Sequence, residues 1–251
     1  MPVMLMVLAA GYGAAAGLLV PRPAYRLAVE PGEAWRGHCP CGRPVAGPAR
    51  GWVGPGRCAD CGPYGPGAVV TALVTGLVCA LLAAATGARP ELAVWLAAVP
   101  VAALLAVVDW RVRRLPDVLT LPLAAGAVLL LGLVALGGGE AGAWGGALLG
   151  GLALGGFYFV LYLVNPAGMG LGDVKLAIGL GVTLGWYGWA ILITGAFAGL
   201  LLGALYGCGL LLSRARGADR RNDGLKQAMP YGPFMIIGAL LGVLLGAAAA
   251  L

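Results

Sequence analysis

Charged side chains are scarce in this sequence, and that scarcity is the first constraint on its fold. Only 10% of the 251 residues are charged, whereas an ordinary soluble domain has about 25%. A soluble globule of this length needs a larger polar surface, so 61% hydrophobic residues and 45 glycines indicate a polytopic membrane protein. The composition also excludes a disordered chain, a secreted disulfide scaffold and, because the glycines keep no three-residue period, a collagen-like repeat.

Apolar runs of about 20 residues, long enough to cross a bilayer, define the predicted fold. Six of them lie at residues 3–20, 68–87, 91–108, 118–137, 141–164 and 232–251. A further uncharged stretch, 176–212, is too long for one span. Because Trp and Tyr cluster with glycines at 185–189, we predict an interfacial turn there with a short span on each side. The sequence therefore predicts an all-α polytopic membrane protein with about eight transmembrane helices.

The basic residues predict the orientation of these spans. With the N-terminus outside, fifteen of the sixteen Lys and Arg residues fall on the cytosolic side, and only Arg89 faces outward. This is a strong positive-inside bias. It includes a basic loop at 213–231, and it explains the net charge of +6 by topology and by contact with anionic lipid headgroups. We therefore expect membrane lipid as a partner and no nucleic acid.

The predicted spans divide the chain into three parts. Residues 1–20 form the first transmembrane helix, residues 21–67 a cytosolic loop module rich in cysteine, and residues 68–251 a membrane domain of seven helices. The loop module is the one hydrophilic insertion between the first two spans. We expect the remainder to be a compact helical bundle with short loops, apart from the basic loop.

Paired cysteines in the loop module suggest a metal site. Each pair is followed by a glycine, and the four residues are Cys39, Cys41, Cys58 and Cys61. The pattern resembles two zinc knuckles around a structural zinc ion, and cytosolic thiols stay reduced, which disfavours disulfides. The first pair is one residue short of Cys-x-x-Cys, so His38 could replace a poorly placed sulfur. Solvent-exposed or vestigial thiols are the alternative. Cys79 and Cys208 lie inside spans and are expected to fill the core.

Three acidic residues lie next to predicted spans and are candidate functional residues. Asp109 follows the span 91–108, and Asp173 opens the sixth span after Gly170-Leu171-Gly172. Because the spans alternate in direction, we expect Asp109 and Asp173 to face each other at the cytosolic side. Two close carboxylates share a proton, so one can act as general base on water while the other polarises a peptide carbonyl. Glu91 and Glu140 are assigned to external turns.

Other roles are open for these residues. Gly170 and Gly172 would let a substrate backbone approach Asp173, but Gly-x-Gly-Asp is a weak pattern by itself. Asp109 could instead pair with the arginines that follow it at the interface. Asp117 precedes the span 118–137, where a helix-capping carboxylate is expected, and its second possible role is to orient the active-site loop.

Three segments together resemble the motifs of the type IV prepilin peptidase family, membrane aspartic proteases of the Gly-x-Gly-Asp type. The first runs from Val108 to Leu123 and the second from Gly170 to Leu176, and the 64-residue separation of the two aspartates fits that family. The third, Met229 to Phe234, resembles the family's proline-glycine motif before the last span. The paired cysteines and the eight predicted spans agree with the same family.

The resemblance implies a membrane endopeptidase that cleaves the basic leader of prepilins or pseudopilins at the cytosolic face of the bacterial cytoplasmic membrane. It makes Asp109 and Asp173 the catalytic pair. The supporting active-site loop would contain Gly170, Gly172, Asp117 and Lys175. The peptidase would need no cofactor.

Many members of this family also N-methylate the new N-terminus, with S-adenosylmethionine as methyl donor. This sequence departs from the family's pattern in the N-terminal region associated with that activity. It has Tyr64-Gly65-Pro66-Gly67 where members have a glutamate, and its first cysteine pair is shortened. The resemblance therefore implies the peptidase and leaves the methyltransferase open.

Two other functions compete with this interpretation. An ion- or proton-coupled transporter could use Asp109 and Asp173 as a relay, although both acids sit at one face and the spans show no internal repeat. A catalytically dead assembly platform is the third hypothesis. The sequence does not say which prepilin is cut, which pathway it serves or whether the protein is an oligomer.

Overall fold

The structure is a computed structural model that describes residues 2–30, 32–138, 141–166, 168–215 and 230–250. These residues are mostly helical, with one two-stranded hairpin. The elements are α1 (Pro2–Leu19), α2 (Pro21–Leu27), α3 (Pro48–Gly51), β1 (Arg57–Cys58), β2 (Gly62–Pro63), α4 (Ala68–Thr86), α5 (Glu91–Val112), α6 (Asp117–Gly137), α7 (Trp144–Val164), α8 (Leu171–Gly185), α9 (Trp189–Ala215) and α10 (Gly232–Ala249). Most of the predicted basic loop, together with Glu140 and Met229, lies outside the described residues.

The described helices confirm a polytopic all-α membrane protein and modify its count of spans. Among them, seven are long and apolar enough to cross a membrane: the helix beginning at Pro2, α4, α5, α6, α7, α9 and α10. α8 stands where the sixth span was predicted, but its 15 residues reach only about 22 Å. That is less than the hydrocarbon thickness of about 30 Å. The predicted turn at 185–189 is confirmed, because α8 ends at Gly185 and α9 begins at Trp189, and α9 with 27 residues is longer than expected.

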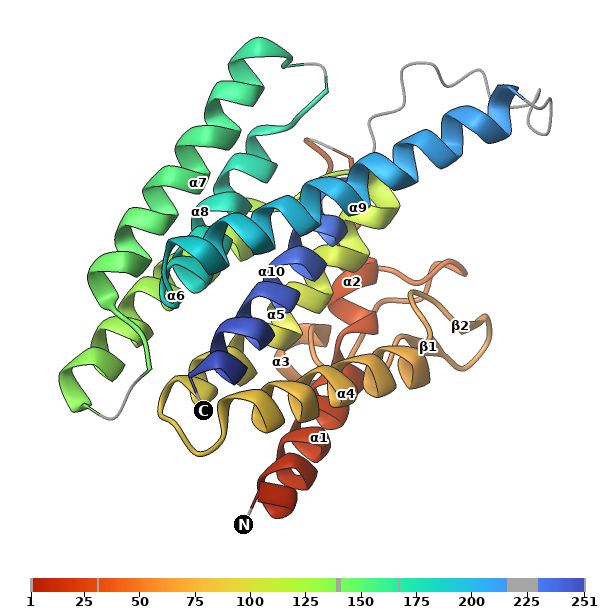
Figure 1. Ribbon diagram of the computed structural model, residues 1–251. Coiled ribbons are helices and arrows are strands. Elements are labelled where there is room, and N and C mark those ends of the chain that lie inside the picture. The colour runs from red at the N-terminus through yellow and green to blue at the C-terminus, as the bar shows by residue number, and fades with distance from the viewer. Residues whose placement is uncertain (1, 31, 139–140, 167, 216–229, 251) are drawn as a thin grey trace.

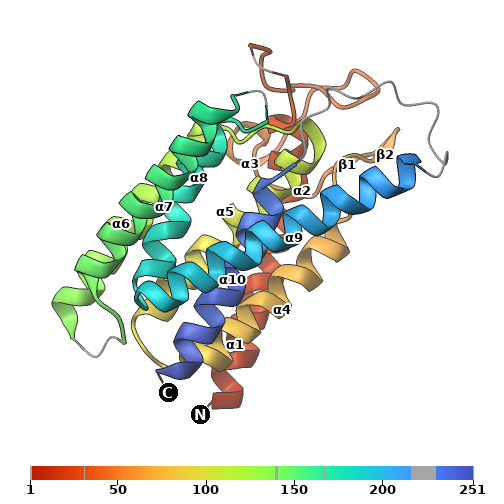
Figure 2. The same cartoon turned by 45° about the horizontal axis from the view of Figure 1, so that its top comes forward.

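The helices pack as neighbouring pairs around α5. α1 packs along α4, α7 along α8 and α9 along α10, while α5 contacts α4, α6 and α10 (Figure 1). Both chain termini lie at one end of the bundle, and the segment between α1 and α4 gathers at the other (Figure 2). The C-terminal end of α5 reaches that second end, where Val108 packs against Val20 and Leu27.

Glycines at the contacts between paired helices explain much of the glycine content. A Cβ on Gly17 of α1 would lie 2.6 Å from the Thr71 carbonyl oxygen of α4, and the Thr71 hydroxyl donates to the Gly17 carbonyl at 2.8 Å. Gly150 of α7 and Gly181 of α8 meet in the same way. A Cβ added to either glycine would lie within 2.5 Å of the other's carbonyl oxygen. Small residues let helices approach closely in a membrane, where packing and hydrogen bonds drive association.

Two minor predictions about single side chains were wrong. Cys79 is fully buried as expected, but Cys208 is exposed on α9 and does not fill the core. Glu91 is not an exposed residue of an external turn. It is completely buried at the first position of α5, where it pairs with Arg89 at 3.4 Å and accepts the N–H of Ala141.

The segment between α1 and α4 folds against the end of α5 through a few anchoring contacts. The buried Arg22 guanidinium donates to the carbonyl oxygens of Ala46, Val53 and Pro55. These bonds join α2 to residues 46–55, which lie between the two cysteine pairs. Arg114, just after α5, donates to the Glu30 carbonyl at 3.2 Å, which ties the same segment to the loop that follows Asp109.

Candidate active site

Asp109 lies in the last turn of α5, with its side chain only 4% exposed. The helix ends directly afterwards because Arg113 adopts a left-handed conformation (φ 51°), and the Arg113 N–H donates to the Asp109 carbonyl. A left-handed non-glycine residue is uncommon and often marks a functional loop. Asp109 Oδ2 accepts the backbone N–H of Gly232 at 2.9 Å, so the start of α10 holds this carboxylate in place.

Asp173 lies in the first turn of α8, and its carboxylate faces back toward the start of the helix. Its Oδ2 accepts the backbone N–H of Gly170 at 3.0 Å, so it satisfies one of the free amides at the helix N-terminus. The dipole of the helix also favours negative charge at this end. Local helix chemistry alone therefore fixes the direction of the Asp173 side chain.

The segments that carry Asp109 and Asp173 lie against each other through Leu115. This residue follows α5 in the chain and packs against Gly172, which precedes Asp173, and near Gly232, whose N–H binds the Asp109 carboxylate. Leu115 is buried, and its Cβ would lie 2.9 Å from a Cβ on Gly172, while its Cδ2 would lie 3.3 Å from a Cβ on Gly232. The loop after α5 and the starts of α8 and α10 thus meet at the Leu115 side chain.

Gly172 has no room for a side chain because it packs against Leu115. The sequence suggested a different reason for this glycine, the approach of a substrate backbone. Gly170 is exposed, and a Cβ there would make ordinary contacts, with the Asp173 carboxylate at 3.6 Å and the Gly172 backbone nitrogen at 3.8 Å. Space for an approaching chain is therefore found at Gly170, while Gly172 sets the distance between α8 and the loop after Asp109.

The capping role predicted for Asp117 is wrong. Pro116 occupies the capping position of α6, Asp117 is the first residue of the helix, and no side-chain cap bond forms. The Asp117 carboxylate instead receives both of its short bonds from Lys175 Nζ, each 2.7 Å long. Because Lys175 is two residues after Asp173, this ion pair joins the start of α6 to the first turn of α8.

Two tyrosines that sequence reasoning missed also lie beside the acids. The buried Tyr158 of α7 donates its hydroxyl to the Tyr231 hydroxyl at 3.3 Å, and Tyr231 directly precedes Gly232, whose N–H binds the Asp109 carboxylate. Tyr231 lies in the proline-glycine segment before α10. The sequence identified that segment as a motif but did not predict the contact of Tyr231 with Tyr158. Tyr158 lies inside an apolar span with no sequence signal beyond its hydroxyl.

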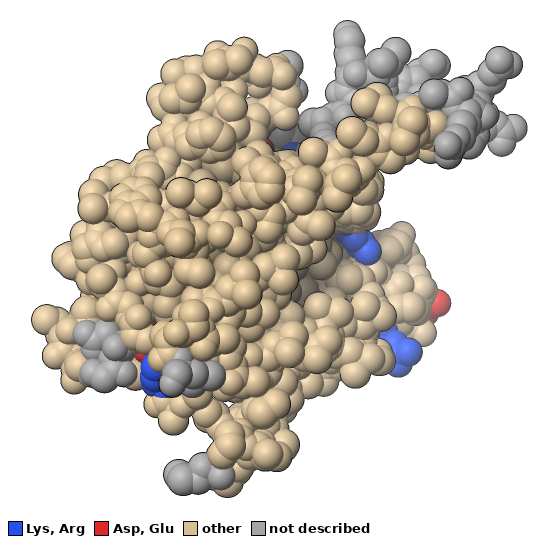
Figure 3. Space-filling view, viewed as in Figure 1, with Lys and Arg blue, Asp and Glu red and all other residues tan. Residues whose placement is uncertain are grey.

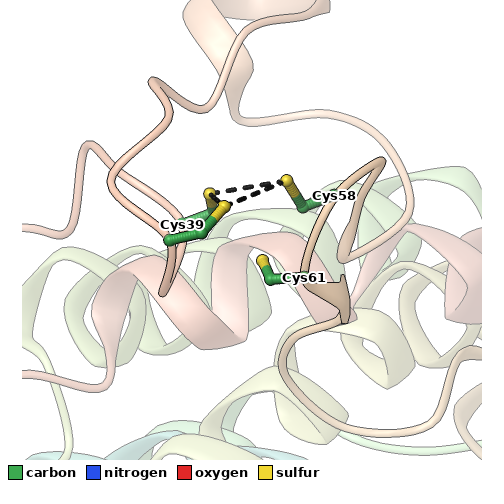
Figure 4. Close-up of side chains that lie close together, drawn as sticks. Cys39, Cys58 and Cys61 are labelled. Carbon is green, nitrogen blue, oxygen red and sulfur yellow. Dashed lines mark hydrogen bonds between the residues drawn. The ribbon is translucent and has the colours of Figure 1, made fainter.

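The four paired cysteines form a second cluster, at the same end of the molecule. All four sulfurs lie within 4.8 Å of one another, and the Sγ–Sγ distances are 3.1 Å for Cys39–Cys41 and 3.5 Å for Cys39–Cys58. Four sulfurs at about 2.3 Å from a zinc ion would lie about 3.8 Å apart. Cys39 stands on one loop and Cys58 and Cys61 on the hairpin, with their sulfurs turned toward one another (Figure 4). The donor set therefore fits a tetrahedral metal ion.

Backbone geometry around the cysteines supports the same conclusion. Gly42 and Gly62, which follow the two pairs, have φ angles of 83° and 74°, as a tight knuckle requires. The N–H groups of Cys61 and Asp60 point at the Cys58 sulfur and lower the pKa of that thiol to about 6. Sharing of a proton with Cys39 raises the pKa of Cys41 to about 12. His38 is not part of the cluster, since the short first pair still brings both of its sulfurs into place.

Comparison with known proteins identifies the family. Residues 96–208 match the type IV leader peptidase family. A prepilin leader peptidase/N-methyltransferase of Aeromonas hydrophila is 33% identical over 90% of this chain and 76% of its own length. The chain belongs to the type IV leader peptidase family. A second relative of the same name, from Aeromonas salmonicida, is 32% identical over 84% of this chain and 72% of its own length.

A third relative with that name, from Pseudomonas putida, is 35% identical over 57% of this chain and 46% of its own length. No solved structure matches the chain. The matched region of the type IV leader peptidase family contains Asp109, Asp117, Asp173 and Lys175. Membership in a family of membrane peptidases confirms the resemblance seen in the sequence and contradicts the transporter hypothesis.

Proposed function

We propose that the chain is a prepilin peptidase that uses Asp109 and Asp173 to cleave the basic leader from type IV prepilins or pseudopilins. The observation that carries this proposal is the packing of the end of α5, the start of α8 and the start of α10 around Leu115, with Asp109 and Asp173 each held by a backbone N–H there, in a member of this family. The relatives' names supply the substrate class. The intact pair of acids argues against a catalytically dead platform.

The chemistry needs one ionised and one protonated carboxyl group. The ionised carboxylate removes a proton from a water molecule whose oxygen attacks the scissile carbonyl carbon, while the protonated carboxyl donates a hydrogen bond to the carbonyl oxygen. The tetrahedral intermediate then breaks its C–N bond, and the proton taken from water passes to the leaving amine. Each acid has one oxygen held by a backbone N–H, which leaves the other oxygen for water or substrate.

The supporting residues act by position in this proposal. The Asp117–Lys175 ion pair and the Gly172–Leu115 contact fix α8 against the loop that follows Asp109. Gly170, at the exposed start of α8, leaves space for the substrate chain beside Asp173. A shift of about 1 Å at such a contact can reduce a rate by about 100-fold.

We further propose that the enzyme lies in the bacterial cytoplasmic membrane with its N-terminus outside and its active site facing the cytosol. The arginines of the 21–67 segment and Arg114 lie at the same end as the acids, joined by the Arg114–Glu30 bond. Arg89 lies at the opposite end of α5, beside Glu91. In this proposal 21–67 is a cytosolic module and 68–251 the peptidase domain.

Cleavage of a reconstituted prepilin tests the function. The prepilin should carry glycine, alanine or valine before the cut, with the basic leader left in water. We expect glycine to be cleaved fastest, alanine more slowly and valine hardly at all, because the backbone must open beside the acids. Equal cleavage of all three, or cleavage from the external side of oriented vesicles, would contradict the proposal.

The cysteine cluster is proposed to hold one structural zinc ion that stabilises the 21–67 module. Cys39, Cys41, Cys58 and Cys61 would be its ligands, and the dyad would need no metal. Protein purified without chelators should contain about one zinc per chain, and a Cys58→Ser/Cys61→Ser variant should contain none. Cys79→Ser/Cys208→Ser is the matched control and should keep its zinc. Metal-free wild-type protein would favour vestigial thiols.

The proposal does not extend to N-methylation. Although the relatives' names include N-methyltransferase, the segment Tyr64-Gly65-Pro66-Gly67 of this chain has no carboxylate. Gly65 packs against the Pro21 carbonyl with a φ of 105°, and Tyr64 is buried against Tyr25. Mass spectrometry of the mature pilin, with and without S-adenosylmethionine, decides between a peptidase alone and a bifunctional enzyme.

A further inference from the structure

An open apolar groove lies between α4, α5 and α10. Its volume is about 300 Å³, and its lining includes the side chains Ala98, Ala102 and Ala106, spaced four residues apart on α5. Val74 and Val78 of α4 form one wall, and Ile236 and Leu240 of α10 form the other. In Figure 1 this face is turned toward the viewer, with α4 below α10 and α5 behind them.

The groove continues to the active site through a second hollow. This hollow has a volume of about 330 Å³ and is lined by Pro66, Trp110 and Arg111, and it shares Ala106 and Pro233 with the groove. Figure 3 shows the surface indented on this face, beside a basic side chain. Trp110 follows Asp109 in the chain, and Pro233 follows Gly232, whose N–H binds the Asp109 carboxylate. The second hollow is therefore lined by the chain neighbours of Asp109 and Gly232, the two residues joined by the carboxylate hydrogen bond.

We propose that this groove binds the apolar helical stem of the prepilin, so that the scissile bond at the cytosolic end of the stem meets Asp109. The inference rests on the proposed function and specifies where that substrate docks. A leader that stays in water and a stem that lies in the membrane meet at the cleavage site. A binding surface for the stem must therefore run into the membrane from the neighbourhood of the acids, and this groove with its adjoining hollow runs along α5 from Trp95 to Trp110, the residue after Asp109.

The dimensions of the groove fit a helix. Its lining on α5 and the adjoining hollow extend from Trp95 to Trp110, a rise of about 22 Å. That length matches most of a transmembrane helix. Alanines at intervals of four residues form one face of α5, and small residues on such a face let another helix approach closely in a membrane. A lipid acyl chain would fill an apolar space without needing such a face or an end beside the acids.

Steric blocking of the groove tests this proposal. Ala102→Phe fills the groove, and Ala97→Phe places the same side chain on an exposed face of α5 that does not line it. Each variant is assayed on full prepilin and on a short peptide that contains the leader and the cleavage site but no stem. We expect Ala102→Phe to raise the KM for prepilin tenfold or more, with little change for the peptide, while Ala97→Phe changes neither.

The outcomes separate this proposal from the proposed function. Equal KM values for prepilin in the two variants would overturn the groove while leaving the peptidase intact, since the peptide is still cut. Failure of wild-type protein to cut either substrate would instead overturn the proposed function.

Photo-cross-linking gives a second readout that does not depend on activity. A benzophenone side chain at Ala98 should form an adduct with prepilin in an Asp173→Asn background, and one at Leu129, exposed on α6, should not. Adducts with lipid alone at Ala98, or equal prepilin adducts at both positions, would overturn the proposal.

Discussion

The two ends of α5 each carry a buried carboxylate, and the two are built for opposite purposes. Glu91 begins the helix, where the dipole favours negative charge, and it pairs with Arg89. Asp109 lies in the last turn, where the dipole disfavours negative charge, and it accepts a backbone N–H instead of forming a salt bridge with a described residue. Both are nearly excluded from solvent. Burial alone therefore does not distinguish Glu91 from Asp109, the acid that the proposed function makes catalytic, whereas their partners do.

The partners of Glu91 join parts of the fold. Arg89 also donates to the Ala247 carbonyl of α10 at 2.7 Å, and Glu91 accepts the N–H of Ala141 before α7. The hydrogen-bond partner of the Asp109 side chain is the backbone N–H of Gly232, which holds one carboxylate oxygen and leaves the other without a hydrogen bond from the described residues. The contacts of Glu91 therefore predict that its loss lowers stability, and those of Asp109 predict that its loss lowers the rate of cleavage.

The largest expected effect is a loss of stability at the Glu91 end. Glu91→Gln leaves the partly buried Arg89 guanidinium without its charged partner, and because breaking a fully buried pair costs about 3–5 kcal/mol, we expect a loss of up to that size. Unfolding in detergent should shift accordingly, while the rate of cleavage per folded molecule stays within about twofold. If Glu91→Gln unfolded like the wild type but no longer cleaved, the proposed difference between the two ends of α5 would be wrong.

A smaller effect is expected from crowding the Asp109 end. In Gly232→Ala, the new Cβ would lie 2.9 Å from Asp109 Oδ2 and push the carboxylate out of place. We expect kcat/KM to fall about 100-fold, as a displacement of about 1 Å can do. Gly126→Ala on α6 is the matched control, since its Cβ would meet nothing within 4 Å. Unchanged cleavage by Gly232→Ala would show that the position of Asp109 does not depend on α10.

The smallest effect concerns the ion pair that braces the acids. Lys175→Met and Asp117→Asn should each lower kcat about tenfold, and the double variant should be no worse than either single variant because both remove the same contact. Their unfolding free energies should change by less than about 1 kcal/mol, since the pair is partly exposed. Arg43→Gln, which breaks the exposed pair with Asp60, is the control and should leave kcat unchanged. Additive losses would show that Asp117 and Lys175 act separately.

The sequence predicted those features that depend on composition, periodicity and motif. The spans and the turn before Trp189 follow from apolar run length and the cluster of Trp, Tyr and Gly, and the facing of Asp109 and Asp173 stays a prediction from alternating direction. Contacts that depend on three-dimensional packing were not predictable. The pairing of Asp117 with Lys175 joins residues 58 positions apart, and the Gly232 N–H reaches Asp109 from 123 positions away. Glu91 was assigned to an external turn because a charge beside a turn is normally exposed, and nothing local shows that Glu91 is completely buried against Arg89.

The most direct test measures cleavage and unfolding together for Asp109→Asn, Asp173→Asn and Glu91→Gln in the same membrane preparation. Asparagine keeps the volume of aspartate but cannot exchange the proton. We expect both Asp→Asn variants to insert and unfold like the wild type but to cleave prepilin at least about 1,000-fold more slowly. Glu91→Gln should cleave prepilin and should unfold under milder conditions than the wild type. Mature pilin from either Asp→Asn variant at a rate near that of the wild type would contradict the aspartate pair.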